Sequence, residues 1–199
     1  MQKSFVLQDQ VSFMSSEETM AASPYPRPGS AEYKLLFGNK EEEKRTLKQW
    51  QRLNKFFSIP LYRLGFLPLF GMSKIFLLLF TTGRKTGKQR ITPLEYRKRN
   101  GIIHVVAGRG KKAHWLKNLQ ANPDAVKIRV GFRKYKASFN IFKTIEEKNE
   151  LLVWYVTKYP KAAKYLFGWD PKKDDPKTAD FTSFSKLIEI IQFYPSKNE

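Results

Sequence analysis

Hydrophobic positions in the middle of the chain predict short strands separated by turns. The run "KIFLLLFTT" (74–82) is continuously apolar and of strand length, and "ITPLEYRKR" (91–99) follows it after a glycine-rich loop. A third run, "GIIHVVAG" (101–108), comes directly after Asn100-Gly101, a dipeptide typical of tight hairpin turns. We therefore expect these three strands to be consecutive antiparallel neighbours.

The pattern changes to strict alternation further along the chain. In "AVKIRVGFRKYKASFNIF" (125–142) apolar and basic residues alternate, which indicates a pair of half-buried strands with a turn near Gly131. The segment "KLIEIIQFYP" (186–195) alternates well enough to be a closing strand.

Helical spacing appears in two segments between these strands. "AHWLKNLQANP" (113–123) predicts a helix that ends before its proline, because a residue preceding proline is pushed out of the helical region. A longer helix is expected over 145–167, where Thr144 and Glu147 have the spacing of a capping box. Short antiparallel strands mixed with a few helices predict an α+β fold built on a small antiparallel β-barrel.

The N-terminal residues carry no sustained periodicity. "SSEETMAASPYPRPGSAEY" is rich in Ser, Pro and Ala, and "NKEEEKR" is a run of charges. We expect residues 1–44 to be disordered or loosely attached, and residues 45–199 to form one domain.

A basic amphipathic helix is predicted over 46–57. Its apolar stripe either packs across the mouth of the barrel, which is the interpretation we favour, or docks on a membrane. The segment that follows, 59–80, is interrupted by prolines, glycines and two cations, so it predicts a helix end, a loop and a buried strand rather than a membrane-spanning helix. We expect the phenylalanines of 56–80 to lie in the core. The stripe consists of Leu47, Trp50, Leu53, Phe56 and Phe57, and Lys48, Arg52 and Lys55 fall between them.

Composition excludes several kinds of chemistry. The chain has no cysteine, which rules out disulfides, thiolate nucleophiles and cysteine metal sites, and its two histidines make a metal site unexpected. His104 lies inside an apolar strand and is interpreted as structural. No secretory signal is recognised at the N-terminus, so we expect a cytoplasmic protein, with attachment to the inner face of the membrane left open.

The net charge of +19 is concentrated in one part of the chain. Residues 81–136 carry 16 basic and 2 acidic side chains, and residues 46–80 carry 5 basic and none acidic. Such a block predicts an anionic partner: nucleic acid, an anionic membrane, or a ligand with several phosphates or carboxylates. A solvated basic face is the alternative. Nucleic acid is the least favoured partner, because few aromatics stand among the cations and no known binding motif is present.

Two glycine-containing loops hold much of this charge. In "TTGRKTGKQR" (81–90) a glycine on each side of Arg-Lys-Thr would let the backbone turn tightly and present its amides, with side-chain donors around them, to a phosphate. The second loop, "AGRGKKAHW" (107–115), also leaves a strand through glycines. If strands 74–82 and 101–108 share a sheet, the two loops lie side by side on its rim and form one anion-binding groove.

The sequence from Leu47 to Pro195 resembles the deazaflavin-dependent nitroreductase family, the F420H2-dependent quinone reductases. The motifs "TTGRKTGKQRITPL" and "NLQANP" carry the resemblance. It implies a split β-barrel related to flavin-binding reductases, and coenzyme F420 (8-hydroxy-5-deazaflavin), whose phosphate and oligoglutamate tail would account for the position of the charge. It also implies hydride transfer to a quinone, a nitro compound or another electron-poor acceptor.

The resemblance also implies site residues. Phosphate and tail would be held by Arg84, Lys85, Thr86, Gly87 and Arg90. The deazaflavin would be lined by Thr92, Pro93 and Leu94, and closed over by Gly108, Arg109, Gly110, Trp115, Leu116, Lys117 and Asn118, with His114 as a further contact. Tyr159 and Tyr165 would be catalytic, as donors of a hydrogen bond or proton to the acceptor.

Other functions stay open at this point. Ala113, Leu116 and Ala162 replace a proline and two tyrosines of the family pattern, which affects the choice of acceptor more than the cofactor. The same barrel could bind FMN, or carry a cofactor without catalysis, because each such ligand offers a phosphate to the same loop. A basic module that binds nucleic acid or membrane is the non-enzymatic alternative.

Overall fold

The computed structural model describes residues 25–196 of the 199-residue chain. These residues form two compact units. The sheet unit comprises residues 35–143 and 188–196, and the helical unit comprises residues 25–34 and 144–187.

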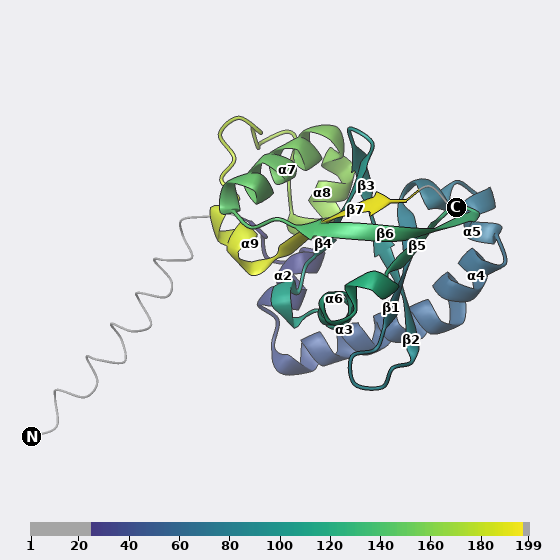
Figure 1. Ribbon diagram of the computed structural model, residues 1–199. Helices are drawn as coiled ribbons and strands as arrows, with labels where there is room; N and C mark the ends of the chain where they lie inside the picture. Colours follow the sequence, from purple (N-terminus) through teal and green to yellow (C-terminus); the bar gives the residue numbers. More distant parts are fainter. Residues whose placement is uncertain (1–24, 197–199) are drawn as a thin grey trace, which may run out of the picture. The chain divides into compact units, whose positions relative to one another are not determined.

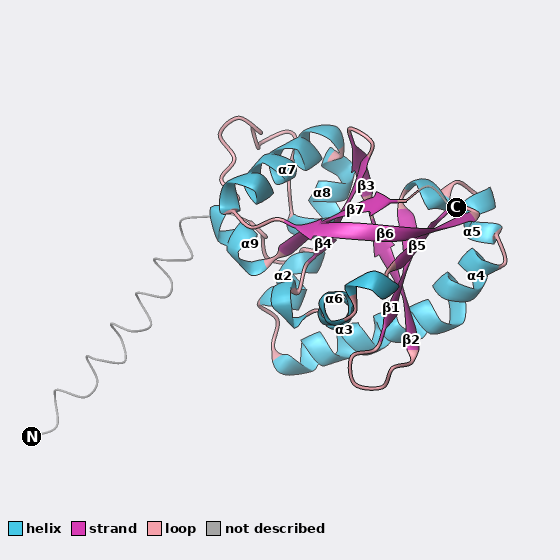
Figure 2. Cartoon of the chain, viewed as in Figure 1, coloured by secondary structure: helices cyan, strands magenta, loops and turns pink. Residues whose placement is uncertain are grey.

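Every strand pair in the sheet unit is antiparallel (Figures 1 and 2). The strands follow one another in the order β2-β1-β5-β6-β7-β4-β3. They are β1 (Phe76–Thr82), β2 (Gln89–Glu95), β3 (Arg97–Arg99), β4 (Ile102–Ala107), β5 (Lys127–Val130), β6 (Arg133–Ile141) and β7 (Glu189–Pro195).

The sheet coils around one hydrophobic core. Leu79 of β1, Val105 of β4 and Phe193 of β7 are buried in the same cluster, although several strands separate β1 from β4 in the sheet. The nine-residue strand β6 makes this possible, because Arg133–Lys136 pair with β5 and Ala137–Ile141 pair with β7. The predicted antiparallel split β-barrel of α+β class is thereby confirmed.

The predicted strand 91–99 differs from expectation. It divides at the buried Tyr96 into β2 and β3, which stand at opposite ends of the strand order. The Tyr96 amide donates to the Ile75 carbonyl at 2.8 Å and its hydroxyl donates to the Ser73 carbonyl at 2.7 Å, which fixes the bend. The hairpin at Asn100-Gly101 is confirmed, with both residues at positive φ. The expected antiparallel pairing of the run 91–99 with both of its neighbours is confirmed, since β2 pairs with β1 and β3 pairs with β4, but the run is not one continuous strand.

The remaining strand and helix predictions of the sheet unit are confirmed. The pair 125–142 turns at Gly131, whose φ is +61°. The strand expected over 186–195 forms as β7 between β6 and β4, although residues 186 and 187 belong to the helix α9 (Thr182–Leu187). Leu116 and Leu119 of α6 are buried in the core against β1 and β4. Helix α2 (Ala31–Leu36) begins in the helical unit and ends in the first residues of the sheet unit. The helical segments of the sheet unit are α3 (Lys40–Leu53), the π-helix η1 (Asn54–Ser58), α4 (Ile59–Arg63), α5 (Phe66–Leu69), α6 (His114–Ala121) and the short 3₁₀ turns η2 (Met72–Lys74), η3 (Gly110–Lys112) and η4 (Pro123–Ala125).

The extension predicted over 1–44 also differs from the structure. Its residues 25–44, which the structure describes, include buried side chains and helices. Tyr25 and Leu35 are buried, and α3 continues through residue 45 without a break, so the expected domain boundary falls inside a helix. Asn39 and Glu42 form a capping box that starts α3 inside what reads as a charge run. Residues 1–24 lie outside the described residues.

Packing of the 46–57 stripe across the barrel mouth is a wrong prediction. None of the residues of α3 is buried. Phe56 and Phe57 of η1 are 63% and 60% exposed, and Phe70 is 78% exposed, so most of the phenylalanines of 56–80 are not core residues. Phe80 is the buried exception. No helix in residues 25–196 combines the length and apolar character needed to cross a bilayer.

The helical unit is held together by aromatic packing. Its helices are α7 (Ile145–Lys158), α8 (Pro160–Phe167) and α9 (Thr182–Leu187), and the expected helix 145–167 divides at Tyr159, before Pro160. The Thr144–Glu147 capping box is present. Arg27 and Asp174 form an ion pair of 2.6 Å, and hydrogen bonding to Arg27 helps to lower the pKa of Asp174 against the opposing effect of burial. The core consists of Tyr25, Phe167, Trp169, Phe181 and Phe184.

His104 is structural, as expected, and is buried on β4. Its Nδ1 lies 3.1 Å from the Ile102 carbonyl and its Nε2 lies 3.2 Å from Gln192 Nε2. Because Gln192 Oε1 accepts from the Tyr194 hydroxyl at 2.8 Å, its amide nitrogen faces the imidazole. This assigns Nδ1 as the protonated nitrogen and Nε2 as the acceptor of a neutral ring. Burial lowers the pKa of His104 below its ordinary value, and the bond to Ile102 partly offsets this.

We expect His104 to make the protein less stable in acid. Because the folded pKa is lowered, the unfolded chain binds the proton first as pH falls through the ordinary value of 6.5, and the stability due to neutral His104 is lost. Urea unfolding from about pH 7.5 to about pH 5 should give a flatter pH profile for His104→Gln than for the wild type. The matched control is the exposed His114→Gln, which should leave the slope unchanged. Equal slopes for the wild type and His104→Gln would contradict this assignment.

Candidate functional site

The loop between β1 and β2 folds tightly on itself. Gly83 donates to the Lys88 carbonyl at 2.9 Å, and the amides of Thr86 and Gly87 donate to the Gly83 carbonyl at 3.1 and 2.8 Å. A Cβ on Gly83 would lie 2.9 Å from Thr86 Oγ1, and Gly87 has a φ of +64°, so both glycines are needed for this shape. The side chains from Arg84 to Arg90 remain exposed.

The loop does not present its backbone amides as predicted. The amides of Gly83, Arg84, Thr86, Gly87 and Lys88 all donate within the protein. Of the loop amides in the described structure, only that of Lys85 has no protein acceptor. An anion at this loop would therefore be held mainly by side-chain cations. Arg90 stands with them, since its Nη2 lies 3.5 Å from Thr86 Oγ1.

Asn118 of α6 and Asn122, the residue that caps the C-terminal end of this helix, fasten the loop to the barrel. Asn118 Oδ1 accepts from the Arg84 amide at 3.2 Å and from Arg84 Nη1 at 3.1 Å. One turn further on, Asn122 Nδ2 donates to the Thr82 carbonyl at 3.4 Å. Asn118 is only 9% exposed and its oxygen is already used, so it orients Arg84.

The second cationic loop precedes α6. Gly110 is buried with a φ of +50°, and the loop continues through the 3₁₀ turn into the helix. Arg109 Nη2 forms an ion pair of 2.6 Å with Glu43 of α3, which fastens this loop to the basic helix. Lys111 and Lys112 are exposed and form no ion pair within residues 25–196.

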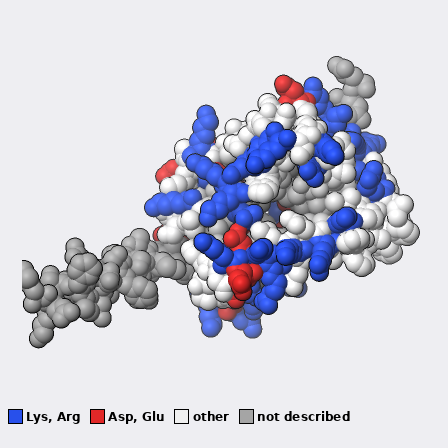
Figure 3. All heavy atoms as spheres, turned by 90° about the horizontal axis from the view of Figure 1, so that it is seen from below, with Lys and Arg blue, Asp and Glu red and all other residues white. Residues whose placement is uncertain are grey.

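The two cationic loops are brought together by α6 and not by the sheet. Strands β1 and β4 are separated by β5, β6 and β7, so the sheet itself does not place their ends side by side. Arg84 is bound to Asn118, which is four residues, or about 6 Å of helix rise, from His114 at the end of the second loop. Figure 3 shows the molecule from the side of α3 and the β1–β2 loop, where Lys and Arg cover much of the surface.

The residues of β2 alternate between two faces. Arg90, Thr92 and Leu94 pair with Thr81, Leu79 and Leu77, which face the core, whereas Pro93 pairs with Leu78 on the opposite face. Pro93 is tolerated because β2 ends the strand order and has no neighbour on one side. A ligand lying on one face of β2 would therefore contact Thr92 and Leu94 but not the Pro93 ring.

Each loop adjoins a buried polar atom without a partner. These atoms are Thr81 Oγ1, opposite Arg90 in the ladder, and Arg109 Nε. Such groups are uncommon in proteins because an unmade buried hydrogen bond costs about 1–3 kcal/mol. Both can donate to an oxyanion, so the residues present fit a phosphate- or carboxylate-bearing ligand.

A hollow of about 440 Å³ opens at the base of the β1–β2 loop. Lys127 and Lys136 stand directly opposite each other in the β5–β6 ladder, an arrangement that is unfavourable unless an anion screens it. Sequence reasoning missed both lysines, although the alternating basic pattern of 125–142 contains them. The hollow is lined by Phe80, Thr81, Thr82, Gln89, Asp124, Ala125, Lys127 and Lys136.

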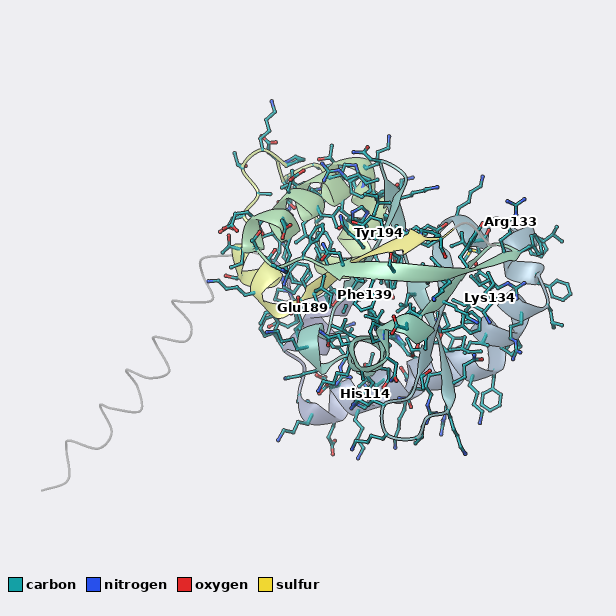
Figure 4. The ribbon with its side chains drawn as sticks, viewed as in Figure 1. His114, Arg133, Lys134, Phe139, Glu189 and Tyr194 are labelled. Atoms are coloured by element: carbon teal, nitrogen blue, oxygen red, sulfur yellow. The ribbon has the colours of Figure 1, made fainter. Side chains whose placement is uncertain are left out.

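The other predicted contacts lie in different environments. Leu116 is 1% exposed in the barrel core, so its side chain does not reach a surface ligand. Trp115 is half-buried against that core, whereas Lys117 is exposed. His114 is also exposed, at the start of α6 (Figure 4).

Tyr159 and Tyr165 belong to the helical unit. Tyr159 is half-buried, with its ring 5.6 Å from that of Trp154 and 5.5 Å from that of Tyr155. Tyr165 is 72% exposed. Their catalytic role stays a prediction.

Comparison with known proteins identifies the family. A sequence profile described as F420H(2)-dependent quinone reductase matches residues 68–171, just over half of the chain. The chain belongs to the F420H(2)-dependent quinone reductase family. The matched region of this family contains both cationic loops, α6 and every strand except β7.

Curated relatives share a shorter stretch. F420H(2)-dependent quinone reductases of Mycobacterium tuberculosis, from strains H37Rv and CDC 1551, are each 42% identical over 62 residues. The alignment covers 30% of this chain and 41% of each relative, so the chain matches about two fifths of their length.

Two solved structures are also similar. An F420-H2 dependent reductase, FDR-A, is 27% identical, and the match covers 61% of this chain and 95% of that one with a TM-score of 0.40. The General Stress Protein 26 from Bacillus anthracis is 14% identical, and the match covers 61% of this chain and 80% of that one with a TM-score of 0.39.

We expect Asn118→Ala to release the β1–β2 loop from α6. The Arg84 amide loses its acceptor, so its hydrogen exchange should accelerate at least about tenfold, and global stability should fall by about 1–3 kcal/mol. Residue-resolved hydrogen exchange measures the first effect and urea unfolding the second.

Asn122→Ala is the matched control. It removes a side chain from the same helix but touches Thr82, so exchange at Arg84 should stay as in the wild type. Unchanged exchange at Arg84 in Asn118→Ala would show that the asparagine does not hold the loop.

Proposed function

We propose that this protein is an oxidoreductase that uses reduced coenzyme F420 to reduce a quinone or another electron-poor acceptor, such as a nitro compound. The observation that carries the proposal is the cationic β1–β2 loop, braced by Asn118, in a chain of the F420H(2)-dependent quinone reductase family. Curated relatives of that name and the anion-binding character of the two loops support it.

The cationic side chains of the loop would hold the anionic parts of the cofactor. Arg84 is oriented by Asn118, so its guanidinium group is restricted before a ligand arrives, and Arg90 lies within 3.5 Å of Thr86 Oγ1 in the same loop. Lys85 and Lys88 add charge without an ion-pair partner in residues 25–196. Preorganised cations bind phosphate with a smaller loss of side-chain entropy.

Thr92, Leu94 and the second loop would contact the ring system. Thr92 and Leu94 share one face of β2, and Gly108, Arg109 and Gly110 lead into α6. Trp115 and His114 follow at the helix start, and Lys117 lies on its exposed side. Leu116 is buried in the barrel core and would not contact the ring, and Pro93 would contribute through the backbone of β2.

The bound cofactor would supply the hydride that reduces the acceptor. The protein would then bind and orient both molecules and keep water from the reacting atoms. This division of labour needs no nucleophilic side chain, which agrees with the absence of cysteine. A tyrosine, Tyr159 or Tyr165, would donate a hydrogen bond to the acceptor. Replacing Tyr165 by Phe removes only the hydroxyl. A lower rate of acceptor reduction in this variant would indicate that Tyr165 is the donor.

Association with a membrane through the helix predicted over 46–57 is part of the proposal. Trp50 and Leu53 of α3 are 44% and 55% exposed, and Lys48, Arg52 and Lys55 stand between the apolar positions. A cytoplasmic location, at the inner face of the membrane, would follow from such attachment.

The function is tested by titrating the purified protein with coenzyme F420 and, separately, with FMN, and by following oxidation of reduced F420 by a quinone. Selective binding of F420 with turnover is expected. Selective binding of FMN would show that FMN is the cofactor, and it would leave the assignment of the β-barrel fold unchanged. Binding of neither ligand would overturn the proposed enzymatic function. The positive charge would then indicate a protein that binds nucleic acid or membrane without catalysis.

We expect Arg84→Ala with Lys85→Ala to weaken F420 binding by at least about tenfold per cation, since a hydrogen bond to a charged group contributes about 1.5–3 kcal/mol and these groups are exposed. The β-barrel core is untouched, so the unfolding midpoint should change little. Fluorescence titration of the cofactor measures the affinity. The matched control is Lys172→Ala with Lys173→Ala, two exposed lysines of the helical unit. Equal affinity in the two double variants would exclude the loop as the binding site.

A further inference from the structure

Exposed apolar side chains, here called the aromatic patch, are concentrated on three connected segments of the sheet unit. Three segments supply it: α3 with η1, α4 with α5, and the turn between β5 and β6. Several of its members are more exposed than single surface hydrophobics usually are, with Leu69 at 73% and Phe70 at 78%. The patch consists of Trp50, Leu53, Phe56, Phe57, Leu61, Leu64, Phe66, Leu69, Phe70, Ile75 and Phe132.

The second and third segments are fastened to each other beneath the patch. Tyr62 of α4 is 1% exposed, and its hydroxyl accepts from the Gly131 amide at 2.9 Å while lying 3.1 Å from the Phe76 carbonyl. Phe132 covers Gly65 so closely that a Cβ there would lie 3.0 Å from its ring. The exposed side chains of the second and third segments therefore project from a held backbone.

The segments that supply the patch carry cations and no acid, and Glu95, which pairs with Phe76 at its edge, forms an ion pair with Arg97. Residues 44–94 and 125–145 include no Asp or Glu at all. Arg133 and Lys134 follow Phe132 directly, at the end of β6 that lies near α5 in Figure 4. Lys134 stands opposite Arg129 in the β5–β6 ladder, so two cations are held side by side there. Partial burial lowers the pKa of Lys134, and the neighbouring cations Lys127, Arg63 and Arg129 lower it further. The remaining cations of the rim are Lys48, Arg52, Lys55 and Lys74.

This combination fits a lipid surface better than another copy of the chain. A symmetric dimer through the patch would bring two strongly cationic rims face to face, and like charges across an interface are unfavourable. Nucleic acid would engage the cations but leave the aliphatic side chains Leu53, Leu64 and Leu69 without a partner. An anionic bilayer offers phosphates at the surface and hydrocarbon beneath them.

We propose that the aromatic patch docks the sheet unit on an anionic lipid bilayer, as one surface built from three segments. Leu64, Phe66, Leu69, Phe70 and Phe132 enter the boundary between headgroups and acyl chains, and the rim cations contact lipid phosphates. The basic helix over 46–57 is one edge of this surface and not the whole anchor. If the proposed function also holds, a lipid-soluble acceptor would reach the protein from within the bilayer.

Co-sedimentation with lipid vesicles tests the docking. The full chain should pellet with vesicles of phosphatidylcholine and phosphatidylglycerol, and less with pure phosphatidylcholine or at high salt. Phe132→Ser, and separately Phe66→Ser with Phe70→Ser, should each lower the partition coefficient at least about tenfold. Trp50→Ser with Leu53→Ser should lower it as well. The matched control is Leu187→Ser, an exposed leucine of the helical unit that is 40% exposed, and it should pellet like the wild type.

Each other outcome overturns the proposal. Failure to pellet with any vesicle excludes docking. If only the α3 variant loses binding, the helix is the anchor and the three-segment surface is wrong. If the chain sediments as a dimer that the patch variants dissociate, and does not pellet, the occupant is a second copy. Coenzyme F420 affinity, measured without lipid, should be unchanged in every patch variant, so failure of docking and failure of the proposed function are distinguishable.

Discussion

The hydrogen bonds that Asn118 accepts from Arg84 are the contact on which the candidate site depends. They join an exposed cationic loop to a helix whose Leu116 and Leu119 are buried in the barrel core. Asn122 adds a second attachment at Thr82. The position of the loop therefore follows from the packing of α6, and the packing of α6 follows from the way the sheet coils. A site made of exposed, flexible side chains gains its geometry in this way from buried, rigid ones.

Coiling of the sheet depends in turn on two features of the strands. Strand β6 is long enough to pair with β5 and β7 in succession, and the run 91–99 bends at Tyr96 so that its halves stand at opposite ends of the strand order. The sequence predicted the strands from their apolar runs and the hairpin from Asn100-Gly101. It did not predict the bend, because Tyr96 continues the strand pattern and is held by hydrogen bonds to Ile75 and Ser73 that lie some twenty residues away.

The candidate site was predictable to a similar degree. Glycine spacing and cation content located both loops, and the motif "NLQANP" marked α6. The use of the loop amides was not predictable, because it depends on the Gly83–Lys88 and Arg84–Asn118 bonds, which are tertiary or turn-specific. The pair Lys127 and Lys136 was missed for a related reason. Alternation shows that both residues face away from the core, but only the ladder register places them opposite each other.

The aromatic patch is the largest difference between the sequence prediction and the structure. The stripe of 46–57 and the phenylalanines of 56–80 were predicted to be buried, and most of these side chains are exposed. An amphipathic stripe predicts burial only if a partner surface exists, and in residues 25–196 the barrel mouth does not supply one for Phe56, Phe57 or Phe70. Leaving such side chains in water costs free energy that folding of this chain does not recover. Tyr62 and Gly131 nevertheless hold the underlying backbone in place. Exposed apolar side chains inside a cationic rim, on a backbone that is held in part from beneath, are expected of a surface whose partner lies outside the chain.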